Sequence, residues 1–149
     1  MAHIDDVIIE PVEGTEYSTP PSAETERLIL NSKDNTTKLV HYHPSGSSFS
    51  GEDLGTFSDV HAFSEIRATT ADGWTFSMSI KPDSKRPSSE EVVYTAQLAD
   101  SQLNSVLMPK VRAKEITMAE KRVLSSRGIC QILKKKYNWE YEEIPPNGK

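Results

Sequence analysis

The sequence predicts an α/β fold in which a small mixed sheet is flanked by helices. Residues 37–42 and 65–80 are rich in β-forming side chains and contain turn signals, as strands and hairpins do. Residues 90–136 instead repeat apolar side chains at helical intervals. The chain has 149 residues, of which 36% are hydrophobic, and this size suits one domain with a modest core. We expect residues 1–89 to form the core and residues 90–149 to form a helical extension that packs on it.

The first predicted elements are short. The apolar run at residues 7–12 predicts a strand that ends at Pro11, and the polar stretch 13–25 predicts an irregular connection. Residues 28–30 and 37–42 are separated by turn-forming residues and predict a hairpin. The second strand of this hairpin leads directly into a His-Pro pair.

A helix and a second hairpin are predicted next. Ser50 can cap a helix that has Asp53 at its third position, which is the spacing of a capping box. Apolar residues at helical intervals extend this helix over residues 51–63. Residues 65–80 predict two strands joined by an Ala-Asp-Gly turn, because Asp-Gly is a strong hairpin signal.

The second half of the chain is predicted to be mainly helical. Ser88 or Ser89 can cap a first helix, and Pro109 interrupts its pattern. Thr117 can cap a second helix. The final residues predict an edge strand at 139–144 and a short disordered tail.

Composition narrows the environment in which we expect the protein. No stretch approaches the roughly 20 apolar residues needed to span a bilayer, and the first residues lack a signal-peptide pattern. Cys130 is the single cysteine, so an internal disulfide is excluded. This cysteine usage favours a reducing, cytoplasmic location. The lack of an apolar span predicts that the protein has no membrane partner.

Charge is unevenly distributed along the chain. Residues 1–107 carry 7 Lys and Arg against 17 Asp and Glu, whereas residues 108–137 carry 9 Lys and Arg against 2 Glu. The basic stretch 110–136 could bind an acidic partner or nucleic acid. The alternative is a solvated helical face that balances the acidic first part. The lack of aromatic residues among the basic ones before Tyr137 favours this alternative.

Residues 41–53, with the sequence HYHPSGSSFSGED, carry a metal-ligand pattern. Two histidines at i and i+2 on a strand point to the same side, so both imidazoles can meet one ion. Asp53, in the first turn of the next helix, can supply a third ligand. Two histidines and one carboxylate leave a fourth tetrahedral position open, as in catalytic rather than structural zinc sites. We therefore predict one Zn²⁺ bound by His41, His43 and Asp53.

This segment resembles the signature of the JAB/MPN (JAMM) family of zinc hydrolases, in which His-x-His-Pro is followed by a short loop and Ser-x-x-Asp. The run His-Pro-Ser-Gly looks most like the bacterial and phage branch that includes RadC-type proteins. With the helix and hairpin that follow it, the similarity covers about a third of the chain. The residues that match the signature are His41, His43, Pro44, Ser50 and Asp53.

The resemblance implies a fold, a reaction and a role for each matching residue. It implies a cytidine-deaminase-like core with a helical addition, and a metallopeptidase that cleaves amide or isopeptide bonds. The substrate would be a peptide or a ubiquitin-like protein. His41, His43 and Asp53 would hold the zinc, and Ser50 would donate a hydrogen bond to the oxyanion.

The family also uses a glutamate on an upstream strand as the general base. Glu24 stands just before the apolar residues 28–30 and ranks first, followed by Glu26 and then Glu10. The family normally places a whole helix between this glutamate and the first histidine, and no amphipathic helix fits before residue 37 here. His61, eight residues after Asp53, is expected on the helix surface rather than as a fourth ligand.

Three functions follow from these observations. The first is a zinc-dependent hydrolase of amide or isopeptide bonds. The second is a non-catalytic zinc-binding interaction module of the same fold. It is favoured because the sequence leaves the general base open among three glutamates. The third is a RadC-like nucleic-acid-associated protein, supported by the basic stretch 110–136. Zinc content with a peptidase assay separates the first two, and salt-dependent nucleic-acid binding tests the third.

Overall fold

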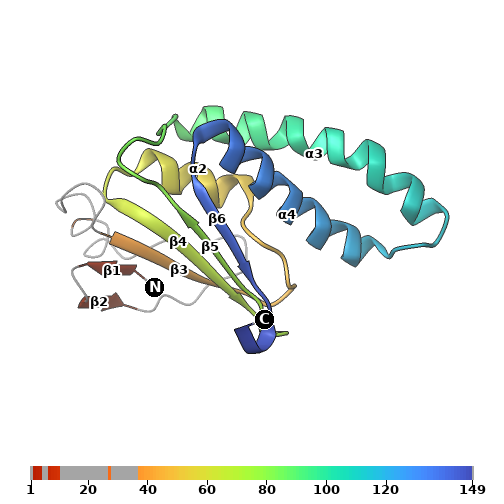
Figure 1. Cartoon of the computed structure of the whole chain (residues 1–149), viewed down its shortest axis with the longest axis horizontal. Helices are drawn as coiled ribbons and strands as arrows, with labels where there is room; N and C mark the ends of the chain where they lie inside the picture. Colours follow the sequence, from red (N-terminus) through yellow and green to blue (C-terminus); the bar gives the residue numbers. More distant parts are fainter. Residues whose placement is uncertain (1, 5–6, 11–26, 28–36, 149) are drawn as a thin grey trace.

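The computed structural model describes residues 2–4, 7–10, 27 and 37–148 (Figure 1). The predicted connection 13–25, the predicted strand 28–30 and the side chains of all three candidate base glutamates lie outside the described part.

The described strands form one mixed sheet in the order β2-β1-β3-β4-β5-β6. β3 and β4 run parallel, and every other neighbouring pair is antiparallel. The prediction of an α/β fold with a small mixed sheet and flanking helices is therefore confirmed. The strands are β1 (Ala2–Ile4), β2 (Val7–Glu10), β3 (Thr37–His43), β4 (Phe63–Thr70), β5 (Thr75–Ser79) and β6 (Glu140–Ile144).

Three helices accompany the sheet: α2 (Gly51–Asp59), α3 (Ser89–Arg112) and α4 (Met118–Tyr137). α2 is the crossover between the parallel strands β3 and β4, as a parallel pair requires. Figure 1 shows α2 lying along the sheet and α3 and α4 forming a hairpin that extends beyond the edge of the sheet. α2 contacts both β4 and α3, so it lies between the sheet and the hairpin.

The core lies between the sheet, α2 and the base of the hairpin. Leu54 and Phe57 project from α2 and are fully buried, and the Phe57 ring packs edge-to-face against Trp139 at 5.7 Å between centroids. Ile66 and Met78 are fully buried on the paired strands β4 and β5. Burial of such side chains is the main favourable term in folding, at roughly 1.5–3 kcal/mol each.

Capping and turn chemistry agree with the sequence. Ser50 and Thr117 each form a complete capping box, and Ser88 rather than Ser89 caps α3. Gly73, in the turn between β4 and β5, has φ of +91°, a conformation that glycine adopts at little cost. The sequence predicted these caps and this turn correctly because each of them depends on only a few neighbouring residues.

Two predicted helix boundaries are wrong. α2 ends at Asp59 instead of residue 63, because Val60 is extended and Phe63 already begins β4. α3 continues through Pro109 to Arg112. The proline lies close to the helix end and leaves the carbonyl of exposed Ser105 without its helical partner, where water can bind it.

The end of the chain adds an edge strand and a turn. β6 pairs with β5 at one edge of the sheet, which confirms the predicted edge strand. Residues 146–148, predicted to lack regular structure, form a short 3-10 turn that approaches Gly73.

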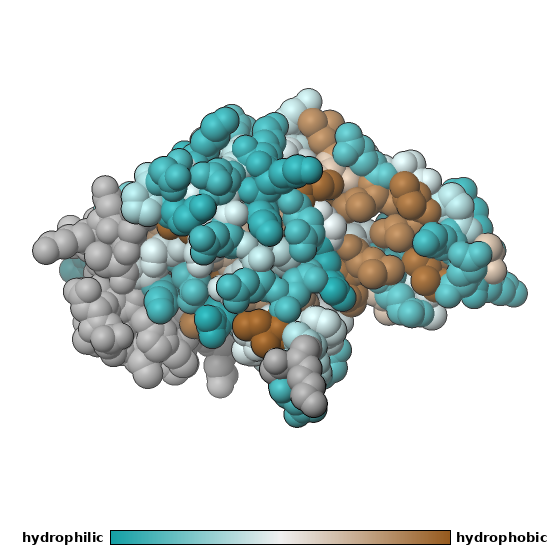
Figure 2. Space-filling view, viewed as in Figure 1, coloured by the Kyte–Doolittle hydropathy of each residue, from teal (hydrophilic) through white to brown (hydrophobic). Residues whose placement is uncertain are grey.

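The hairpin exposes apolar side chains. Figure 2 shows hydrophobic residues gathered over the part of the hairpin that projects from the body. Among the described helices, none is both long and apolar enough to cross a membrane. The large hydrophobic residues exposed on the hairpin are Tyr94, Leu98 and Val106 on α3, and Met118 and Leu124 on α4.

Candidate metal centre

The three predicted metal ligands come together at the carboxyl end of β3. His41 and His43 lie two residues apart on this strand, and Asp53 lies in the first turn of α2. One ligand atom from each residue can be chosen so that all three lie within 4.8 Å of one another. The coarse prediction, that these three side chains are close enough to bind a metal ion, is therefore confirmed.

The spacing of the ligand atoms suits an ion between them. His41 Nδ1 lies 3.6 Å from Asp53 Oδ1, and His43 Nε2 lies 3.6 Å from Asp53 Oδ2. Both distances exceed the 2.7–3.2 Å of an ordinary N–H···O hydrogen bond. Ligands on a tetrahedral ion with bonds of about 2.0–2.1 Å are separated by roughly 3.4 Å. One atom from each residue lies within 4.8 Å of the other two, so the three side chains must move closer together to bind one ion.

His43 is the most informative of the three residues. It is 3% exposed, and its Nδ1 lies 3.0 Å from the carbonyl oxygen of Ser47. A carbonyl only accepts, so Nδ1 carries the hydrogen and Nε2 carries the free lone pair. That Nε2 atom is buried and has no hydrogen-bond partner. A buried polar atom without a partner costs about 1–3 kcal/mol, and a metal ion would satisfy it.

Asp53 is held in place by the cap of α2. Its carboxylate accepts the backbone N–H of Ser50 at 3.1 Å, and its own N–H donates to Ser50 Oγ at 3.1 Å. These two bonds fix the carboxylate relative to the helix terminus. Ser50 Oγ acts as the acceptor in the cap, so its hydroxyl hydrogen is not used there. The same serine can cap the helix and donate to a substrate oxygen.

The electrostatic environment favours neutral imidazole at His41. Burial lowers the pKa of His41 below 6.5, the nearby Asp53 carboxylate partly opposes this, and His43 lowers it further. Neutral imidazole is the form that binds metals, because the protonated ring has no free lone pair. The site therefore suits metal binding at neutral pH.

A buried polar network lies beneath the loop between His43 and Ser50. Ser48 Oγ lies 2.8 Å from the Tyr141 hydroxyl and 3.4 Å from Cys130 Sγ. Burial raises the pKa of the Cys130 thiol to about 11, so this cysteine is an inert thiol at neutral pH. Sequence reasoning missed the network, since Ser48 lies 82 residues before Cys130 and 93 before Tyr141. The available signal was that Tyr141 and Glu143, two residues apart on the predicted edge strand, point to the same face.

The structure describes little of the three candidate general bases. Glu24 and Glu26 lie outside the described residues, as does the side chain of Glu10. The backbone register pairs Glu10 with Ala2, and Ala2 in turn with Leu39, two residues before His41 on β3. Glu10 is thus two strands away from β3, level with Leu39 rather than with the histidines. His61 is exposed and lies in a turn after α2, not on the helix as predicted.

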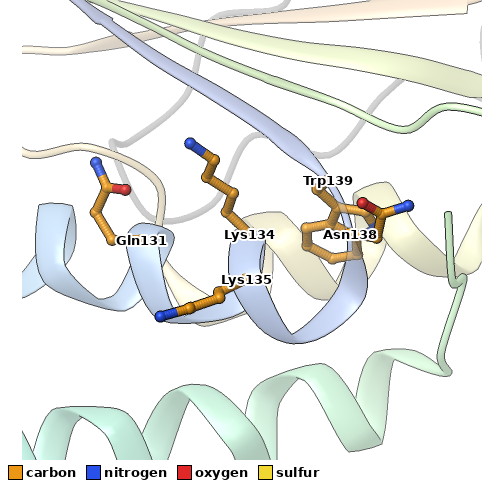
Figure 3. Close-up of a pocket in the computed structure, with 5 residues that line it drawn as sticks. All are labelled: Gln131, Lys134, Lys135, Asn138 and Trp139. Atoms are coloured by element: carbon orange, nitrogen blue, oxygen red, sulfur yellow. The ribbon is translucent and has the colours of Figure 1, made fainter.

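A separate hollow lies at the end of α4 (Figure 3). It has a volume of about 400 Å³ and contains none of the three cluster residues. Lys134 and Lys135 in this hollow belong to the basic last turn of α4, where cations interact favourably with the helix dipole. The lining residues are Gln131, Lys134, Lys135, Asn138 and Trp139.

Comparison of the chain with protein-family models, curated proteins and solved structures finds no match.

Proposed function

We propose that this protein is a zinc-dependent hydrolase of amide or isopeptide bonds, of the JAMM type. The observation that carries the proposal is the buried, unpartnered Nε2 of His43, which faces Asp53 beside His41. Two neutral imidazoles and one carboxylate suit zinc better than magnesium or calcium, which prefer oxygen ligands. When bound, zinc would supply Lewis-acid chemistry, lowering the pKa of water and polarising a carbonyl.

The chain's own residues supply the remaining functions. His43 is almost fully buried, whereas His41 and Asp53 are 23% and 16% exposed, so the cluster opens to solvent on one side. Ser50 is hydrogen-bonded to the ligand Asp53, so it lies next to the cluster that a substrate carbonyl would approach. The free hydroxyl hydrogen of Ser50 is then available for the oxyanion of a tetrahedral intermediate.

A general base must take a proton during the attack. Glu24, Glu26 and Glu10 are the candidates, and each is proposed from the sequence. Glu10 is the candidate whose backbone the structure describes, on β2, two strands away from the ligand strand. Replacing each glutamate separately by glutamine identifies the base as the variant that retains zinc and loses turnover.

A non-catalytic zinc-binding module is the second candidate. Among the residues that the structure describes, the cluster includes one carboxylate, Asp53, and no second one that could serve as the base. Such a protein would bind zinc with the same three ligands and would bind a partner near the metal site without cleaving it.

The decisive experiment combines zinc analysis with a cleavage assay. Purified protein is prepared in chelator-free buffer with zinc, analysed for metal by elemental analysis, and incubated with peptide and ubiquitin-isopeptide substrates. We expect about one zinc per chain and measurable cleavage. Ser50→Ala should reduce turnover by roughly 10²-fold or more, as loss of an oxyanion-hole donor does.

Ser50 also caps α2, so its replacement needs a matched control. Thr117 caps α4 with the same capping box, and Thr117→Ala removes a cap of the same kind far along the chain. Each substitution should cost about 1 kcal/mol of stability, but only Ser50→Ala should slow cleavage. A metal-free wild type would contradict the proposal. Bound zinc without cleavage of either substrate would favour the non-catalytic module.

A further inference from the structure

The loop between His43 and Ser50 is held by residues from the other end of the chain. Its Ser48 N–H donates to the hydroxyl of Ser126 on α4 at 2.9 Å. Its Ser48 hydroxyl, which is 2% exposed, pairs with the Tyr141 hydroxyl on β6 at 2.8 Å. The loop that joins two metal ligands thus depends on α4 and β6 for its position.

Tyr141 is in turn fixed by a charged pair. Its hydroxyl donates to Glu143 Oε2 at 2.9 Å, while Arg127 of α4 donates to both carboxylate oxygens of Glu143, at 3.0 and 2.7 Å. The Arg127 guanidinium also lies 4.9 Å from the centroid of the Trp74 ring. A bidentate arginine–carboxylate pair has a narrow geometry, so Glu143 presents its oxygen to Tyr141 in one orientation.

The network reaches the metal ligand through two direct contacts. The carbonyl oxygen of Ser47, the residue before Ser48, accepts the Nδ1 hydrogen of His43. The ring of Phe49, the residue after Ser48, packs edge-on against both His43 and Tyr141. Moving Ser48 would shift both neighbours, and both of them set the orientation of the imidazole.

We propose that Tyr141, with Glu143 and Arg127 behind it, is a positioning residue that fixes the tautomer and orientation of His43 through Ser48. This inference rests on the metal site of the proposed function, but the orientation of His43 can be measured without any metal. Groups that hydrogen-bond a metal-binding histidine set its tautomer and contribute to metal affinity. Here that influence would originate in the C-terminal strand and helix.

Tyr141→Phe is the test variant, because it removes one hydroxyl and keeps the ring that packs on Phe49. Tyr137→Phe is the matched control. Tyr137 is also buried, at 1% exposed against 6% for Tyr141, and its hydroxyl donates to Thr95 on α3 at 2.9 Å instead of to the ligand loop. Both variants lose one buried hydroxyl and should lose similar stability.

Two measurements are made on the full chain, at 25 °C and one pH near 7.5. The first is the zinc dissociation constant, obtained by competition with a chromophoric chelator. The second is the ¹⁵N chemical shift of the two His43 ring nitrogens in zinc-free protein, which reports the tautomer directly. Thermal melting of the zinc-free variants records the general loss of stability.

We expect Tyr141→Phe to weaken zinc binding about 3- to 10-fold, the equivalent of one net hydrogen bond, and to mix the His43 tautomers. Tyr137→Phe should leave both readouts at the wild-type values despite a similar fall in melting temperature. Ser48→Ala should reproduce the effects of Tyr141→Phe, and combining the two changes should add little, because they interrupt the same connection.

Equal zinc affinity and an unchanged His43 tautomer in Tyr141→Phe would overturn the inference and leave Tyr141 a core residue. Equal effects of the Tyr141 and Tyr137 variants on both readouts would also overturn it. If the wild type binds no zinc, the proposed function fails, and the ¹⁵N shifts of the zinc-free protein still decide whether Tyr141 positions His43.

Discussion

The ligand region and the helical hairpin depart from a simple globular pattern in opposite ways. Around β3 and the start of α2, polar groups are buried, and two of them, Nε2 of His43 and Oγ1 of Thr37, have no hydrogen-bond partner. On α3 and α4, by contrast, large apolar side chains such as Leu98 and Val106 are exposed. A buried polar atom without a partner and an exposed apolar side chain both cost stability unless something binds them. The first has a specific chemical solution, a metal ion.

The ligand region and α4 also differ in charge. The part of the chain up to residue 107 is acidic, whereas residues 108–137 are basic. Lys134, Lys135 and Lys136 end α4, where the helix dipole favours cations. This arrangement accounts for part of the basic stretch as helix stabilisation. The predicted binding of an acidic partner or nucleic acid stays a prediction.

The largest expected difference between the regions is in packing. Phe57→Ala should destabilise the protein by about 3–5 kcal/mol, because the ring is fully buried against Trp139 and its loss leaves a cavity. Val106→Ala should change stability by no more than about 0.5 kcal/mol, since Val106 is 61% exposed. Denaturant unfolding measures both. A large cost for Val106→Ala would show that the hairpin face is covered in solution.

The next expected difference between the regions is in the stability gained from zinc. At a free zinc concentration of 100 times Kd, the wild type should gain about 2.7 kcal/mol of stability, and its melting temperature should rise accordingly. His43→Ala should abolish this gain, because it removes the buried ligand. His61→Ala is the control, and it should keep the full gain because His61 lies outside the cluster. Loss of the gain in both variants would point to a different site.

The metal cluster could be predicted because its geometry is encoded locally. The i, i+2 spacing of His41 and His43 fixes their common side once the strand is recognised. Ser50 and Asp53 define the helix start by themselves, so the third ligand follows from the cap. Each step involves residues that are close in sequence, and local signals of this kind are the ones a sequence reports well.

What the sequence did not reveal depends on long-range contacts. The position of His61 was wrong because the start of β4, which is fixed by pairing with β3, ends α2 early. The continuation of α3 past Pro109 was missed because the penalty of a proline depends on where the helix ends. The link from Ser48 to Tyr141 joins residues 93 positions apart and has no local pattern at all.

Acid should weaken the ligand region before it affects the hairpin. Burial lowers the pKa of His41 in the folded protein, whereas the unfolded chain keeps a value near 6.5. Below about pH 6.5 the unfolded state therefore binds more protons, and stability falls as the pH decreases through this range. The gain from zinc should fade in the same window, because protonated histidine cannot bind metal.

Melting temperatures between pH 7.5 and 5.5, with and without zinc, measure this effect. His41→Gln should flatten the profile of the zinc-free protein, and His61→Gln, outside the cluster, is the control. A wild-type profile that is flat over this range would contradict the assignment of His41 as a partly buried, neutral ligand.

The last comparison is between two glycines that contact α3 from different helices. A Cβ on Gly51, at the start of α2, would lie 2.9 Å from the Cβ of Ala96, which cannot rotate away. A Cβ on Gly128, in α4, would also lie 2.9 Å from its nearest neighbour, but that neighbour is the terminal Cδ1 of Leu103. Both sites are equally tight, and they differ in whether the obstructing atom can move.

Gly51→Ala should therefore cost about 1–3 kcal/mol and also weaken zinc binding, because α2 must shift and it carries Asp53. In Gly128→Ala, alanine's helix preference of about 1 kcal/mol opposes the repacking of Leu103, so the net change should be close to zero. Zinc affinity should be unchanged in Gly128→Ala. Chemical denaturation with chelator competition measures both quantities. Equal zinc affinities in the two variants would mean that the ligand region tolerates movement of α2. The cap at Ser50 would then not be what holds Asp53 in the cluster.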